Sequence, residues 1–95
     1  MEIKLSKSEN KGRFFIEEEG KMLAQITWVK ETEDHIILDH TFVDDSLRGQ
    51  GIARQLFDKV IELARDRDIK IQPVCSYAQT MFERYPQYRD VLYNF

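Results

Sequence analysis

The chain has 95 residues, of which 42% are hydrophobic and 33% are charged, and its formal net charge is −3. This length predicts a single domain over residues 1–95, and the composition excludes a disordered chain. The negative charge argues against a nucleic-acid partner, and the absence of a membrane-spanning run or signal peptide predicts a cytoplasmic protein with no membrane partner. One cysteine and two histidines exclude an internal disulfide and argue against a metal site.

The first half of the chain has the pattern of β-strands. Apolar residues gather in runs over residues 13–18, 22–29 and 35–43, and short polar turns separate these runs. A weaker pattern around Ile3 and Leu5 predicts a further strand at the edge of the sheet. Strands joined by short turns favour an antiparallel meander.

The second half changes to a helical period. Apolar residues recur three and four positions apart over residues 51–67, which predicts a long helix. Residues 69–75 then predict a buried strand, and Pro73 places that strand at an edge or near a bulge. Because a strand, a helix and a strand follow one another, strands 35–43 and 69–75 are expected to be parallel neighbours.

The last part of the chain predicts a short helix and an aromatic tail. The helix is expected to start at Ser76 or Tyr77, to carry Ala78, Met81, Phe82 and Tyr85 on one face, and to end at Pro86. Residues 88–95 are expected to pack as a final strand or an extended segment.

The loop before the long helix carries the clearest chemical signal. Two glycines one residue apart, Gly49 and Gly51, let the backbone approach a ligand closely. The following helix presents its unpaired N–H groups and positive dipole end to the same loop, which favours a phosphate or pyrophosphate. Ile52 after Gly51 excludes a Walker loop, and Arg54 stands where a dinucleotide loop needs its third glycine. A glycine-rich turn without a ligand remains the alternative.

Arg48, Gly51 and Ala53 match the pattern Arg/Gln-x-x-Gly-x-Gly/Ala, which resembles the acetyl-CoA loop of the GCN5-related N-acetyltransferases. The short length and the flanking His40-Thr41 and Pro73-x-Cys75-Ser76-Tyr77 resemble the minimal single-domain members of that superfamily. The resemblance implies an α/β (α+β) fold. Its sheet would be mixed and mostly antiparallel, with a splayed parallel strand pair, one long helix and one short helix.

The resemblance also implies a cofactor, acetyl-CoA or CoA, and a role for each loop residue. Backbone amides would bind the CoA pyrophosphate, Arg48 and Gly49 would shape the turn, and Phe42 and Val43 would bind the pantetheine arm through their backbones. The amides in question are those of Gln50, Gly51, Ile52, Ala53 and Arg54. The implied activity is acetyl transfer to an amine of a small molecule or a protein, by a monomer or weak homodimer.

Two other functions stay open beside this one. The first is a non-catalytic acyl-CoA-binding or sensing module, and the second is a small interaction domain with an empty loop. The chain also departs from the family. It lacks the two helices that usually follow the first strand, so the acceptor side is expected to be open. Aligning the family's Asn-x-x-Ala-x-x-x-Tyr on Ala78 places Cys75 at the asparagine and Phe82, which cannot donate a proton, at the tyrosine.

Cys75 and His40 are therefore the candidate catalytic residues. Cys75 precedes a helix N-terminus, which favours the thiolate, and it would either attack the thioester or protonate the leaving thiolate. A small buried residue at a strand end is the structural alternative. His40 would act as the base, although strand alternation with Ile36 and Leu38 also fits a core histidine. The same alternation directs Thr41 the other way.

Overall fold

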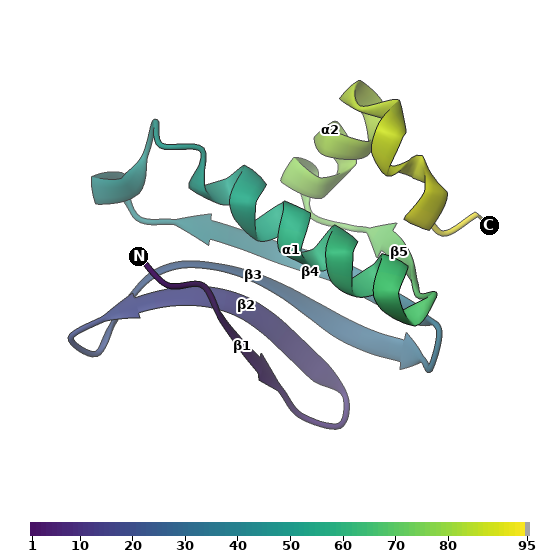
Figure 1. Cartoon of the computed structure of the whole chain (residues 1–95), viewed down its shortest axis with the longest axis horizontal. Coiled ribbons are helices and arrows are strands. Elements are labelled where there is room, and N and C mark those ends of the chain that lie inside the picture. The colour runs from purple at the N-terminus through teal and green to yellow at the C-terminus, as the bar shows by residue number, and fades with distance from the viewer. Residues whose placement is uncertain (95) are drawn as a thin grey trace.

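The computed structural model describes residues 1–94, which form one sheet with helices packed on one of its faces (Figure 1). No helix in this part of the chain has the length and apolar character needed to cross a membrane. In chain order the elements are β1 (Lys4–Lys7), β2 (Lys11–Glu18), β3 (Lys21–Thr32), β4 (His35–Val43), the 3-10 helix η1 (Asp45–Leu47), α1 (Ile52–Arg67), β5 (Lys70–Pro73), α2 (Ser76–Arg84) and the 3-10 helix η2 (Pro86–Val91).

The five strands follow the order β1-β2-β3-β4-β5 across the sheet. The first four are antiparallel and β5 is parallel to β4, because α1 connects these two strands as a crossover. The predicted mixed, mostly antiparallel fold is confirmed. The weak strand at Ile3 and Leu5 is present as β1, and Pro73 ends the edge strand β5.

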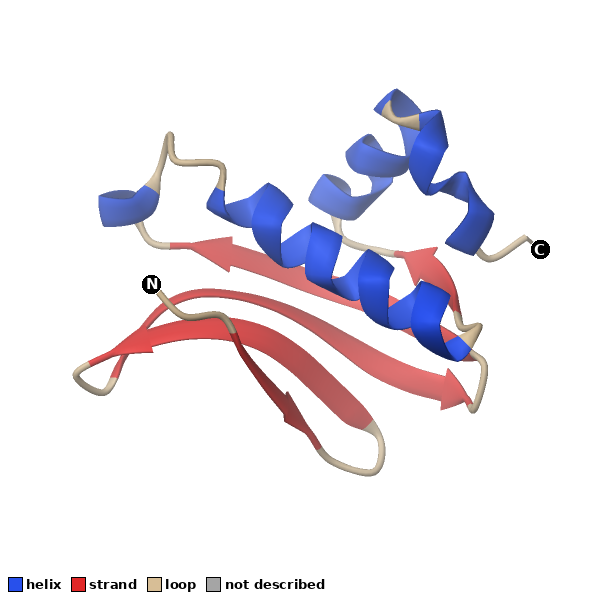
Figure 2. Ribbon diagram, viewed as in Figure 1, coloured by secondary structure: helices blue, strands red, loops and turns tan. Residues whose placement is uncertain are grey.

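Helix α1 lies across the sheet and carries much of the core (Figure 2). Its period places Leu56, Phe57 and Val60 on the core-facing side of the helix, where each is fully buried. Burying one such side chain contributes about 1.5–3 kcal/mol. The helix begins after Gly51 (φ 70°) and ends at Asp68 (φ 56°), two left-handed residues, which confirms the predicted helix to within one residue.

The prediction that residues 88–95 pack as a final strand or an extended segment is wrong for residues 88–91, which belong to η2. Pro86 stands in the first turn of η2, where its fixed φ suits a helical start. Tyr88 is buried edge-on against Phe57 with the ring centroids 5.1 Å apart, and Arg89 Nε donates to the carbonyl of Phe82 at 2.9 Å. Only Leu92 makes an isolated parallel bridge, and Phe95 lies outside the described residues.

A β-bulge in β4 decides which side chains reach each face of the sheet. Leu38 pairs with Trp28 and His40 pairs with Thr27, so Asp39 is an extra residue opposite β3. Before the bulge, the even-numbered Leu38 faces α1. Beyond the bulge the alternation of the side chains is inverted, so the odd-numbered residues of β4 face α1. The expectation that His40 shares a face with Ile36 and Leu38 is therefore wrong, since His40 is exposed on the opposite face.

Gly12 allows the close packing of β2 against β3. A Cβ atom built on Gly12 would lie 2.3 Å from two atoms of the Trp28 indole, and Trp28 is only 5% exposed. Gly12→Ala is therefore expected to lower the free energy of unfolding by about 1–3 kcal/mol through overpacking. Urea unfolding measures the loss. In a Trp28→Phe background the same substitution should cost less, and an equal cost in both backgrounds would contradict this origin.

Candidate active site

The N-terminus of α1 is open to a ligand. Its N-cap is Gly51, which provides no capping side chain, and the first turn carries no acidic residue. The carbonyl of Gly51 accepts the first helical bond, from the N–H of Gln55 at 3.1 Å. Within residues 1–94 the N–H groups of Ile52, Ala53 and Arg54 have no backbone acceptor, as at any uncapped helix start. These three N–H groups and the helix dipole make an anion-binding site.

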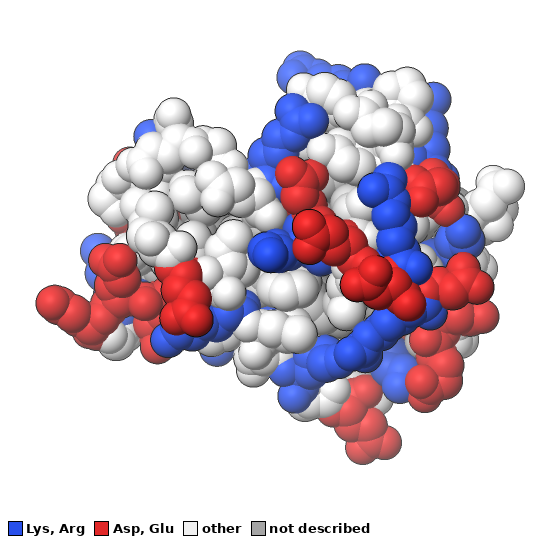
Figure 3. All heavy atoms as spheres, viewed as in Figure 1, with Lys and Arg blue, Asp and Glu red and all other residues white. Residues whose placement is uncertain are grey.

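The two loop glycines hold this site open. Gly49 has a φ of 82° and Gly51 a φ of 70°, and a Cβ atom on either would meet no other atom within 4 Å. Both positions therefore need glycine for their backbone angles and not for lack of space. On the face drawn in Figure 3, the projecting η1–α1 loop is mostly uncharged, whereas acidic and basic side chains crowd along α1.

Acidic residues shape the turn before the loop. The Asp44 carboxylate accepts hydrogen bonds from the hydroxyl of Ser46 at 2.6 Å and from its N–H at 3.1 Å, and these bonds hold the pKa of Asp44 below its usual value. Arg48 Nε lies 2.9 Å from the carboxylate of Asp45, and both side chains are exposed. The predicted cation at the rim of the loop is present, paired with a neighbouring acid that a ligand would compete with.

Arg54 points away from the loop, toward the C-terminal segment. Its guanidinium lies 4.4 Å from the centre of the Tyr85 ring and donates to the hydroxyl of Tyr88 at 3.1 Å. Tyr88 in turn donates to Asp58 at 2.8 Å, one helical turn along α1. The side chain of Arg54 thus ties the start of α1 to η2, while its backbone N–H stays at the helix terminus.

Strands β4 and β5 separate after the carbonyl group of Leu38. Their parallel ladder ends at the pair Leu38 and Pro73, and the Leu38 carbonyl then accepts from the N–H groups of both Val74 (2.9 Å) and Cys75 (3.2 Å). From Asp39 to Val43, β4 is paired with β3 on one edge, and the described residues provide no strand on its other edge. Phe42 and Val43 lie at the end of this unpaired stretch.

Cys75 lies in the gap that this parting creates. It is the N-cap residue of α2, it is partly buried, and its Sγ lies 3.4 Å from Oγ1 of Thr41. Thr41 pairs with the buried Ile26 and so shares the helix-covered face with Cys75, whereas His40 lies on the other face. The structure brings Cys75 together with Thr41 and not with His40. Strand alternation alone missed Thr41, because the bulge inverts the alternation.

Phe82 and Tyr77 frame the same region from α2. Phe82 is 3% exposed and packs edge-on against Phe57 at 5.4 Å, so it is a core residue. Tyr77 stands in the first turn of α2 with its ring 6.2 Å from that of Phe57. Burial raises the pKa of Tyr77 to about 12, so its phenol stays protonated at neutral pH.

A comparison with models of known protein families identifies the family of this chain. A model of the GCN5-related N-acetyltransferase family matches residues 13–91. The chain belongs to this family. The acetyltransferase fold predicted from the loop is thereby confirmed. A comparison with curated proteins finds no match.

Solved structures agree with this family. The NMR structure of a GCN5-like protein from Staphylococcus aureus is similar with a TM-score of 0.73 and 36% identity, over 97% of this chain and 89% of that chain. The ribosomal-protein-S18-alanine N-acetyltransferase of Escherichia coli has the same fold, with a TM-score of 0.64 and 22% identity, over 81% of this chain and 52% of that chain.

An acetyltransferase of this family from Elizabethkingia anophelis, crystallised with acetyl-CoA, gives a TM-score of 0.60 at 15% identity. The match covers 83% of this chain and 53% of that chain. The present acetyltransferase-family chain therefore spans about half the length of these last two proteins.

The partly buried phenol of Tyr77 predicts a specific loss of stability at high pH. Its folded-state pKa, about 12, lies above the value of 10.0 for a free tyrosine. Its contribution to stability is therefore fully present below pH 10 and is lost as the pH rises through about 12. The urea midpoint of the wild type should fall between pH 9 and pH 12 more than that of Tyr77→Phe. Equal slopes for the two proteins would show that Tyr77 is not the group responsible.

Proposed function

We propose that this chain is an acetyl-CoA-dependent N-acetyltransferase that transfers the acetyl group to an amine. The observation that carries the proposal is the uncapped N-terminus of α1, which the chain reaches from the end of β4 through η1 and the loop with Gly49 and Gly51. A helix terminus of this kind suits the pyrophosphate of CoA. Because the amides of residues 50–54 do the binding, the cofactor needs no cationic side chain beyond Arg48 at the rim.

The unpaired edge of β4 supports the next part of the proposal. Backbone N–H and C=O groups without a partner bind an extended chain, as an added strand would be bound. The pantetheine arm of CoA is such a chain, and it would run from the helix terminus along Val43 and Phe42. The thioester would then lie in the gap between β4 and α2, beside Cys75.

The chemistry at that point has two routes. In direct transfer the amine attacks the thioester carbon, the C–N bond forms, the C–S bond breaks, and the amine loses a proton as the CoA thiolate gains one. In the covalent route the Cys75 thiolate attacks the thioester carbon, the bond to the CoA sulfur breaks, and CoA leaves as a thiolate while S-acetyl-cysteine forms. The amine then attacks this second thioester, the C–N bond forms, the bond to the Cys75 sulfur breaks, and the proton lost by the amine returns to the released thiolate. Thr41, in contact with the sulfur, would orient it in either route. His40 would serve as the base only for an acceptor that approaches from the open face of the sheet.

The side of the sheet from which an amine acceptor would approach is open, as either route requires. A three-residue turn, residues 8–10, joins β1 to β2, so no helices wall off the sheet there. This favours a large acceptor, such as a protein, or a small amine reached without enclosure. An acyl-CoA-binding or sensing module is the second candidate, because none of the described groups in contact with Cys75 is a base. Repeated release of CoA thiol in the presence of an amine separates the two.

The loop hypothesis predicts a selective loss of CoA affinity in Gly51→Ala. An alanine at a φ of 70° is strained by about 1–2 kcal/mol, and relief of that strain would turn the N–H groups away from the phosphates. Calorimetry should show a dissociation constant for CoA raised about tenfold. Gly20→Ala is the matched control, since Gly20 has a φ of 77° and is also uncrowded but belongs to the β2–β3 turn and not to the η1–α1 loop. Equal affinities in the two variants would contradict pyrophosphate binding at α1.

The covalent route predicts an acetylated protein. After incubation with acetyl-CoA and no amine, intact-mass spectrometry should show one added acetyl group on the wild type and none on Cys75→Ala. Thr41→Val should be acetylated more slowly and Thr41→Ser at close to the wild-type rate, because serine keeps the hydroxyl beside the sulfur. If Cys75→Ala is acetylated to the same extent, Cys75 is not the acceptor and direct transfer is the remaining route.

A further inference from the structure

Two exposed apolar side chains flank the gap between β4 and α2. The large hydrophobic residues that are exposed among residues 1–94 are Met1, Leu5, Phe42 and Val74. Phe42 is 39% exposed and follows Thr41 in β4, and Val74 is 50% exposed and precedes Cys75. Because Thr41 and Cys75 are in contact across the gap, Phe42 and Val74 lie on opposite sides of that contact.

Both of these side chains lie on the face of the sheet that no helix covers. Thr41 is on the helix-covered face, so Phe42, the next residue of the strand, is on the other one. The N–H of Val74 continues the pairing of β5 to the carbonyl of Leu38, and the alternation continues with it. Val74 is then on the open face and Cys75 on the helix side. The gap thus has a polar pair on one side of the sheet and an apolar pair on the other.

The exposure of Phe42 is a consequence of the bulge in β4. Without the extra residue at Asp39, the even-numbered Phe42 would face α1, as Leu38 does. The observed register instead leaves a phenyl ring partly in water, which is unfavourable. A ligand with an apolar part, bound at the open side of the gap, would cover this ring and remove the unfavourable contact with water.

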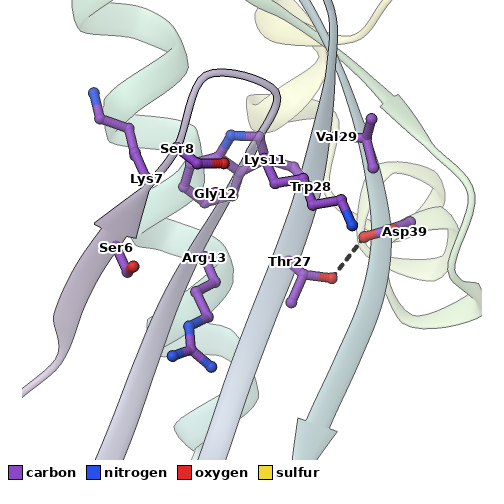
Figure 4. Close-up of a pocket in the computed structure, with 10 residues that line it drawn as sticks. All are labelled: Ser6, Lys7, Ser8, Lys11, Gly12, Arg13, Thr27, Trp28, Val29 and Asp39. Atoms are coloured by element: carbon purple, nitrogen blue, oxygen red, sulfur yellow. Dashed lines mark hydrogen bonds between the residues drawn. The ribbon is translucent and has the colours of Figure 1, made fainter.

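A carboxylate and an imidazole lie on the same open face. Asp39 follows Leu38, at whose carbonyl β4 and β5 separate, and its Oδ1 accepts a hydrogen bond from Thr27 at 2.6 Å. Figure 4 shows this bond between β3 and β4. None of the ion pairs among residues 1–94 involves Asp39, so its negative charge is available to a cationic ligand. His40, the next residue, is exposed.

We propose that Phe42, Val74 and Asp39 form the acceptor subsite of the transferase, and that the acceptor is a small primary amine carried on an apolar group. This inference rests on the proposed function, since an acceptor needs a thioester in the gap. An amine is an ammonium ion at neutral pH, and the Asp39 carboxylate attracts it. The apolar group packs between Phe42 and Val74, on the side of the sheet opposite to CoA.

In direct transfer, this arrangement gives each proton of the reaction a destination. His40 takes one proton from the ammonium, and the free amine attacks the thioester carbon from the open face. The C–N bond forms and the C–S bond breaks. The second proton lost by the nitrogen passes to the CoA thiolate, so the products are the N-acetylated amine and CoA thiol.

A binding experiment tests the subsite without turnover. The protein, without CoA, is titrated with 2-phenylethylamine at constant ionic strength, and the backbone amide signals of Phe42 and Val74 are followed by NMR. Parallel titrations use 2-phenylethanol, which lacks the ammonium group, and ethylamine, which lacks the ring. The shifts should saturate with 2-phenylethylamine, and each of the other two compounds should bind about tenfold more weakly. Equal affinities for the three compounds, or shifts that do not saturate, would overturn the proposal.

Matched variants locate the binding. Phe42→Ala, Val74→Ala and Asp39→Asn should each weaken the affinity for 2-phenylethylamine about fivefold. Leu5→Ala is the control, because Leu5 is similarly exposed, at 44%, but lies in β1, and it should titrate as the wild type does. If Leu5→Ala weakens binding as much as Phe42→Ala, the amine binds apolar surface in general and the subsite is overturned.

Release of CoA thiol from acetyl-CoA then separates the subsite from the proposed function. The wild type should have a kcat/KM for 2-phenylethylamine about tenfold above that for ethylamine, and Val74→Ala should reduce this ratio about fivefold, through KM. Thiol release at equal kcat/KM for both amines would support the transferase and overturn the subsite. Binding with the expected variant effects but without thiol release would support the subsite and overturn the transferase activity.

Discussion

The carbonyl group of Leu38 is the point on which the candidate site depends. It accepts hydrogen bonds from the N–H groups of both Val74 and Cys75. The parallel pairing of β4 and β5 ends at these two bonds. Had the ladder continued, Cys75 would be a strand residue and the far edge of β4 would be covered. Because it stops, Cys75 becomes the N-cap of α2, and a stretch of β4 backbone is left without a strand partner. The gap and the thiol within it therefore have the same cause.

The proposed cofactor binding and the proposed chemistry rest on different parts of the chain, and this difference decided what could be predicted. In the proposal, binding relies on backbone N–H groups at the start of α1, next to Gly49 and Gly51, and glycine spacing before a helical period is visible in a sequence. The order of strand, helix and strand also predicted β4 and β5 as parallel neighbours, because a helical crossover returns the chain to the end of the sheet where the first strand began. Fold and loop could thus be inferred from residue pattern alone.

The placement of side chains around Cys75 could not be inferred in this way. One extra residue at Asp39 inverts the alternation of β4, and a bulge leaves no mark in a run of otherwise ordinary strand residues. The sequence pattern therefore assigned His40 and Thr41 to the wrong faces. The aromatic residues after Pro86 were predicted wrongly for a related reason. Tyr88 fits a strand by composition, but Pro86 and the contact of Tyr88 with Phe57 favour a 3-10 turn.

The bulge at Asp39 also limits how residue roles transfer between relatives. Two proteins that both carry His-Thr before the glycine loop present the same side chain to the position of Cys75 only if both have the extra residue. In a relative without it, the histidine and not the threonine would face the position of Cys75. Identical residues in an alignment are therefore not enough to transfer a catalytic role here. The presence or absence of the bulge, which decides the face on which each side chain of the strand lies, must be compared first.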